Sequence, residues 1–154
     1  NYNPFSVEGY FHLGKVYLVA NEIDKARQNF LKALKFNPYS DQVLINLGLV
    51  EQRSKNLHLA ENYFLKAISA NPSNSEWFYL IGNFYFEKRD YDRAIFYYSK
   101  ALEINGEDTR TLFNLGQAYF EKGDTQKAKK LWQDLLQKDP NFYQAKEKLS
   151  QFSD

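Results

Sequence analysis

The sequence repeats a Leu-Gly or Ile-Gly pair every 34 residues, and this spacing restricts the fold more than any other feature. The glycines of the four pairs are Gly14, Gly48, Gly82 and Gly116. Other markers keep the same step: Ala26, Ala60, Ala94 and Ala128; Phe30, Phe64, Tyr98 and Trp132; Pro38, Pro72, Gly106 and Pro140. A period of this length is typical of arrays in which one supersecondary unit recurs.

Within each repeat, apolar residues fall at helical spacing in two stretches, which a short polar turn separates. In the third repeat Phe78, Ile81 and Tyr85 form the first apolar stripe, and Ala94 and Tyr98 begin the second. Proline follows the second stretch in most repeats and stops it, because proline lacks the amide proton. The pattern predicts helix hairpins over 7–40, 41–74, 75–108 and 109–142, and a capping helix over 143–152.

The marker residues also predict how the helices pack. Small residues at Gly82 and Ala94, and at their counterparts in the other repeats, would let two paired helices approach closely. Large rings at the position of Tyr98 would fill the space between repeats, each contributing roughly 1.5 to 3 kcal/mol when buried. A lone hairpin cannot bury both of its apolar stripes, so neighbouring repeats must stack.

The order of a large residue, Leu-Gly, an aromatic, Ala, an aromatic, Ala and Pro resembles the tetratricopeptide repeat (TPR) over residues 7–142. The resemblance implies an all-α fold, an alpha-alpha superhelix in which antiparallel helix hairpins form a right-handed solenoid, as one domain over 1–154. One departure is Glu51, which stands where the other repeats carry tyrosine. Residues 1–6 contain Asn3-Pro4 in the phase of Asn37-Pro38, so we expect the tail of an upstream repeat there, with an ordinary loop as the alternative.

Composition excludes several classes of function. With 20 Lys and Arg against 19 Asp and Glu, the formal charge of +1 does not favour nucleic acid or an acidic membrane as a partner. No segment approaches the ~18 apolar residues of a membrane span. The absence of cysteine leaves the compartment open between cytoplasm and periplasm, with the cytoplasm slightly favoured. The absence of methionine indicates a processed or excised piece. Abundant Lys, Asn, Phe, Tyr and Ile favour a bacterial source.

The sequence offers no catalytic, cofactor or metal site. His12 and His58 lie at different places in the repeat, and neither has a second ligand at metal-binding spacing. Gly14-Lys15 is explained by the repeat and is not a phosphate-binding loop. Carboxylates such as Asp90 stand in turns, where they cap helices. We therefore expect a non-enzymatic protein.

TPR arrays bind partners on the surface made by their first helices, and the resemblance implies the same here. The residues expected in this groove are Phe11, Lys15, Asn46, Leu49, Tyr79, Asn83, Phe86, Phe113, Asn114, Gln117 and Phe120. Rings and amides suit a peptide, because amides both donate to and accept from its backbone. Some family members hold a terminal carboxylate with several cations, but of the corresponding residues in the later repeats only Lys148 is a cation, so this mode is not expected.

The resulting expectation is a protein interaction scaffold or adaptor that binds a peptide segment of a partner protein. Two alternatives remain open. The domain would serve as an assembly element if it associated with itself or stacked through its convex or terminal surfaces. RNA binding by helical repeats is the other alternative, which the near-zero charge disfavours.

Overall fold

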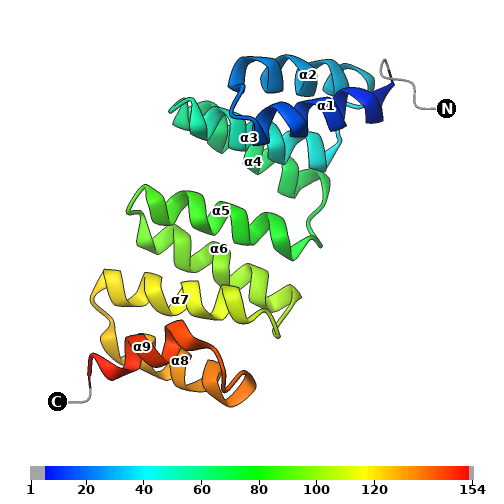
Figure 1. The fold of residues 1–154 in the computed structure, drawn as a ribbon. Helices are drawn as coiled ribbons and strands as arrows, with labels where there is room; N and C mark the ends of the chain where they lie inside the picture. Colours follow the sequence, from blue (N-terminus) through cyan, green and yellow to red (C-terminus); the bar gives the residue numbers. More distant parts are fainter. Residues whose placement is uncertain (1–5, 153–154) are drawn as a thin grey trace. The chain divides into compact units, whose positions relative to one another are not determined.

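The computed structural model describes residues 6–152, and these residues form helices joined by short turns, with no strand among them (Figure 1). The helices are α1 (Val7–Val19), α2 (Ile23–Phe36), α3 (Asp41–Arg53), α4 (Leu57–Ala70), α5 (Ser75–Glu87), α6 (Tyr91–Ile104), α7 (Thr109–Lys122), α8 (Thr125–Lys138) and α9 (Tyr143–Ser150). The predicted all-α class is confirmed. The tail of an upstream repeat, expected around Asn3-Pro4, lies outside the described residues.

The chain groups into two compact units, residues 1–73 and 74–154. The first unit contains the hairpins α1–α2 and α3–α4, and the second contains α5–α6, α7–α8 and the final helix α9 (Figure 1). A single domain over 1–154 stays a prediction.

Polar residues at the turns set where the helices begin. Ser40, Asn74 and Asp108 each accept a hydrogen bond from a backbone N–H in the first turn of the helix that follows them. Inside the hairpins, Asp90 and Asp124 cap the second helix with their side chains. Asn56 precedes α4 without capping it.

One turn position takes the left-handed backbone conformation in all four repeats. It holds Asn21, Lys55 and Arg89 at φ of 59°, 62° and 59°, and Gly123 at 97°. This region costs an L residue with a Cβ roughly 1–2 kcal/mol, and glycine has no such cost. Three repeats therefore hold strain that the fourth repeat avoids.

The large ring of each repeat packs on the glycine of the same repeat. A Cβ on Gly14 would lie 2.6 Å from Cδ1 of Phe30, and a Cβ on Gly82 would lie 2.5 Å from Cδ1 of Tyr98. We predicted that these rings fill the space between repeats, but they also close their own hairpin. The glycines are there because the rings occupy the space of the missing side chain.

In three repeats, a cation lies over the ring of the first-helix tyrosine. The pairs are Lys25 over Tyr17 at 5.3 Å, Arg93 over Tyr85 at 4.6 Å and Lys127 over Tyr119 at 5.1 Å. Both residues of the pair are replaced in the second repeat, where Glu51 takes the place of the tyrosine and Leu59 the place of the cation.

Glu51 is 2% exposed and is held by two hydrogen-bond donors. Arg27 donates from Nε to its Oε1 at 2.7 Å, and Asn56 donates from Nδ2 to its Oε2 at 2.8 Å. Because Arg27 belongs to α2 and Glu51 to α3, this buried ion pair joins the first repeat to the second.

Helix α9 covers the last repeat. Its Ala145 is fully buried against Trp132, which is itself 0% exposed. Phe152 follows the helix and lies 6.5 Å from the Trp132 ring, centroid to centroid. Lys146 and Ser150 face the solvent, which gives the helix the polar outer side that a cap requires.

Candidate functional site

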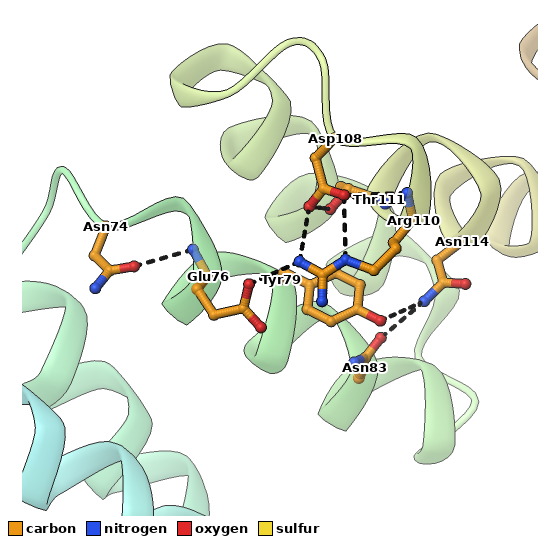
Figure 2. Close-up of polar contacts among 8 residues, drawn as sticks. All are labelled: Asn74, Glu76, Tyr79, Asn83, Asp108, Arg110, Thr111 and Asn114. Atoms are coloured by element: carbon orange, nitrogen blue, oxygen red, sulfur yellow. Dashed lines mark hydrogen bonds and ion pairs between the residues drawn. The ribbon is translucent and has the colours of Figure 1, made fainter. Parts of the chain in front are cut away.

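Four polar side chains of the second unit form a hydrogen-bonded chain between α5, α6 and α7. The Tyr98 hydroxyl donates to Oδ1 of Asn83 at 2.7 Å. Asn114 donates from Nδ2 to the same Asn83 oxygen at 3.1 Å and to the Tyr79 hydroxyl at 3.4 Å (Figure 2). Tyr79, Asn83 and Asn114 come from first helices, and Tyr98 reaches them from the second helix of its repeat.

Tyr98 holds the buried end of this hydrogen-bonded polar chain. This ring is 1% exposed, and burial raises the pKa of its hydroxyl, so the hydroxyl remains a donor at neutral pH. A buried O–H needs an acceptor, because an unsatisfied one costs about 1–3 kcal/mol. Oδ1 of Asn83 is the acceptor that it has among the described residues.

An ion-pair cluster flanks Tyr79. The Arg110 guanidinium lies 4.9 Å from the centre of the Tyr79 ring and donates from Nη2 to Oε2 of Glu76 at 2.9 Å (Figure 2). Arg110 also contacts Asp108 at 3.4 Å. The hydrogen bond that Arg110 donates to Glu76, and after it the charge of Asp108, raise the pKa of Arg110. Two carboxylates therefore already engage this cation.

Asp108 holds the start of α7. Burial would raise the pKa of its carboxyl, but hydrogen bonds from Thr111 and the charge of Arg110 outweigh burial and lower it. Thr111 is fully buried and donates from its hydroxyl to Oδ2 of Asp108 at 2.8 Å. The carboxylate thus fixes the helix that carries Asn114.

A pocket of about 160 Å³ opens beside the polar chain. Its lining residues are Asn83, Phe86, Glu87, Tyr98, Asn114 and Gln117. Four of the residues predicted for the groove therefore meet at one pocket. Sequence reasoning missed Tyr98 and Glu87; the signal for Tyr98 was a hydroxyl at a position where the first two repeats carry phenylalanine.

Phe113 and Phe120, also predicted for the groove, pack against the ring of Trp132. Their centroids lie 6.2 Å and 6.0 Å from it. The Phe113 carbonyl accepts a hydrogen bond from Nε1 of Trp132 at 3.2 Å. Both phenylalanines are half-buried, so each contributes to the core while keeping part of its ring accessible.

The predicted residues of the first unit do not form a comparable chain. Phe11 packs 6.1 Å from Phe30, and Lys15 lies 5.5 Å above the Phe11 ring. Asn46 donates to the carbonyl of Gln42 in its own helix, and Leu49 packs against the core. The polar chain is thus a feature of the third and fourth repeats.

The described residues include no group of three or more His, Asp or Glu side chains placed to hold a metal ion. Among the same residues, no helix has the length and apolar character needed to cross a membrane.

Comparison with known families identifies two matching models. The model described as cytochrome c-type biogenesis protein H TPR domain matches residues 1–111, and a tetratricopeptide repeat model matches residues 85–149. No curated protein matches the sequence.

Solved structures of repeat proteins are similar to this chain. A structure from the functional characterization of Pseudomonas aeruginosa pilF has 24% identity and a TM-score of 0.81, covering 90% of this chain. The chain spans 64% of that protein. MamA has 25% identity over 92% of this chain and 83% of its own, with a TM-score of 0.81. YrrB, described as a TPR protein with an unusual peptide-binding site, has 21% identity over 96% of this chain and 76% of its own, with a TM-score of 0.80.

Proposed function

Because this chain belongs to the tetratricopeptide repeat family, matched by the cytochrome c-type biogenesis protein H TPR domain over residues 1–111, we propose that it is a non-catalytic adaptor. It binds a peptide segment of a partner protein on the surface of its first helices. The observation that carries this proposal is the pocket between α5 and α7, where Asn83, Asn114 and Gln117 meet the ring of Phe86.

The carboxamides of the pocket have hydrogen-bonding groups to spare. Among the described residues, Nδ2 of Asn83 and Oδ1 of Asn114 make no hydrogen bond, and Gln117 makes none with its side chain. Buried side-chain nitrogen and oxygen atoms in this part of the chain all have partners, so the unpartnered atoms reach the solvent. Accessible donors and acceptors beside a ring suit a peptide, which has backbone amides and apolar side chains.

Beside this pocket, the proposed surface includes the half-buried rings of Phe113 and Phe120. In the first unit, Phe11, Lys15, Asn46 and Leu49 hold the corresponding positions of the proposed surface. YrrB shows that a protein of this fold can have a peptide-binding site. Nucleic acid is not the proposed partner, because no cation lines the pocket and Glu87 does.

Selection from a random peptide library tests the proposal. The wild-type domain is expected to enrich peptides whose binding weakens roughly tenfold or more, ~1.4 kcal/mol, in an Asn83→Ala/Asn114→Ala double variant. Gln117→Ala is a second variant, since its loss leaves no buried group without a partner. Gln133→Ala/Gln137→Ala removes two exposed amides of α8 and serves as the matched control. Equal binding by the wild-type domain and all variants would show that the groove is not the site.

A further inference from the structure

The polar chain occurs in one place in the described protein, although its positions recur in every repeat. The position of Tyr98 holds Phe30, Phe64 and Trp132 in the other repeats, none of which has a hydroxyl. The position of Asn83 holds Lys15, Leu49 and Gln117. A hydroxyl from the second helix and a carboxamide from the first therefore coincide in the third repeat alone.

The Tyr98 hydroxyl determines which way the Asn83 carboxamide faces. Because the buried hydroxyl must donate, the Asn83 oxygen has to point toward it, and the Asn83 nitrogen points away. The same oxygen accepts a hydrogen bond from Nδ2 of Asn114. This bond fixes the Asn114 carboxamide with its oxygen pointing away from the other polar side chains. One hydroxyl thus orients two amides.

The carboxamide atoms of Asn83 and Asn114 that point away from the polar chain are one donor and one acceptor. Nδ2 of Asn83 and Oδ1 of Asn114 are the groups without a partner among the described residues. In an antiparallel β-sheet, one residue of an extended strand donates a hydrogen bond from its N–H to a single partner residue and accepts one from that residue at its C=O. The two carboxamides offer an extended segment the same pair of bonds.

The charges around the pocket favour an uncharged backbone over a chain terminus. Glu87 lines the pocket, and no lysine or arginine does. The nearby Arg110 is engaged by Glu76 at 2.9 Å and by Asp108 at 3.4 Å. A terminal carboxylate would therefore find no cation to pair with among the residues that line the pocket.

We propose that the pocket binds the N–H and C=O of one residue in an extended, internal segment of the partner protein. Asn83 donates to the carbonyl and Asn114 accepts from the N–H, while Tyr98 is the positioning residue that fixes both carboxamides. This inference rests on the proposed function and adds to it the class of segment and the residue that orients the site.

Two peptide libraries test the first part of the proposal. In one, fixed residues flank the random segment on both sides, and in the other the random segment ends at a free carboxylate. The wild-type domain is expected to enrich binders from the first library and to bind them roughly tenfold more tightly than any from the second. Preference for the free carboxylate would overturn the inference.

An ester scan of an enriched internal peptide tests the second part. Replacing each backbone N–H in turn by an ester oxygen should weaken binding roughly tenfold at one residue, because Asn114 then has no donor to accept from. Tyr98→Phe keeps the ring over Gly82 but removes the hydroxyl. No single ester substitution in the peptide should therefore weaken its binding to this variant. Tyr119→Phe, whose hydroxyl makes no hydrogen bond to a described residue, is the matched control and should keep the wild-type pattern.

The two proposals fail in different ways. The first case is a peptide whose binding depends on Asn83 and Asn114 but is weakened by no ester substitution. The second is a peptide whose ester-sensitive residue is the same with Tyr98→Phe as with the wild-type domain. Either result would overturn the inference and leave the adaptor function standing. If no enriched peptide depends on the groove residues, the proposed function itself fails. Thermal unfolding of Tyr98→Phe near the wild-type temperature shows that the ring still packs.

Discussion

The ring of Tyr98 occupies the space in which a side chain at Gly82 would begin, with its Cδ1 2.5 Å from the place of a Cβ. Tyr98 is 1% exposed, so the ring is almost completely enclosed by the protein. The same ring carries the hydroxyl that orients Asn83. The packing of one hairpin and the geometry of the candidate site therefore depend on the same pair of residues.

Gly82→Leu is expected to lower the free energy of unfolding by about 1–3 kcal/mol, because the added side chain overpacks the contact with Tyr98. Urea unfolding measures the loss. Gly106→Ala is the control, since a Cβ there would lie 3.6 Å from the nearest atom, the carbonyl oxygen of Leu102. A Gly82→Leu domain that unfolds like the wild type would contradict the packing described for this hairpin.

Glu51→Gln should destabilise the first unit by roughly 1–3 kcal/mol, because it leaves the Arg27 guanidinium without its buried counter-ion. A double-mutant cycle with Arg27→Met isolates the pair, and its coupling energy is expected to be at least ~0.5 kcal/mol. Chemical denaturation provides the measurement. Additive effects of the two substitutions would show that the ion pair contributes nothing beyond the separate side chains.

Asp108 should make stability depend on pH in the acid range. Its pKa is lower in the folded protein than its usual value, so the carboxylate stabilises the fold above the unfolded-state pKa of about 3.9. This contribution is lost as the pH falls through the folded-state pKa. Asp108→Asn should therefore differ from the wild type in urea unfolding at neutral pH, and the difference should shrink as the pH falls below about 3.9. Asp134→Asn is the control for the substitution itself.

Ala145→Arg should detach α9, because Ala145 is fully buried against the last repeat and has no room for a long charged side chain. Trp132 would then meet water, and its fluorescence should shift to longer wavelength. A Trp77→Phe background removes the second tryptophan, and Lys146→Ala on the exposed side of α9 is the control. Unchanged Trp132 emission in Ala145→Arg would show that α9 does not shield the ring.

Lys55→Gly should raise the free energy of unfolding by roughly 0.5–1 kcal/mol, since glycine removes the cost of a left-handed residue but adds freedom to the unfolded chain. Gly123→Ala should lower it by about 1–2 kcal/mol for the opposite reason. Thermal unfolding distinguishes the two directions. A loss of stability in Lys55→Gly would mean that the lysine side chain contributes more than its backbone costs.

The sequence was sufficient to predict the helices, because the markers at 34-residue spacing are local and recur in phase. First helices were expected to begin near residues 7, 41, 75 and 109, and α1, α3, α5 and α7 begin there. A proline or glycine follows each second helix, so the ends of these helices follow from backbone chemistry: Pro38, Pro72, Gly106 and Pro140.

Side-chain contacts that occur in a single repeat could not be predicted from the 34-residue period. Tyr98 was classed as core because of its ring, and the partner of its hydroxyl depends on where two helices bring side chains together. Glu51 was recognised as a departure from the pattern, but its pairing with Arg27 of the preceding repeat could not be read from periodicity. Periodic positions predict packing, whereas single polar contacts require the structure.

The single glycine among the four left-handed turn positions has a consequence for how the hairpins open. Stability in repeat arrays is approximately a sum of local and nearest-neighbour contributions, so strain in one turn lowers the cost of opening that hairpin. Gly123 spares the α7–α8 turn this cost, while Lys55 and Arg89 impose it on α3–α4 and α5–α6. Amide hydrogens at the α7–α8 turn are therefore expected to exchange with solvent more slowly than their counterparts, and the hairpin that supplies Asn114 is the one held closed most firmly at its turn.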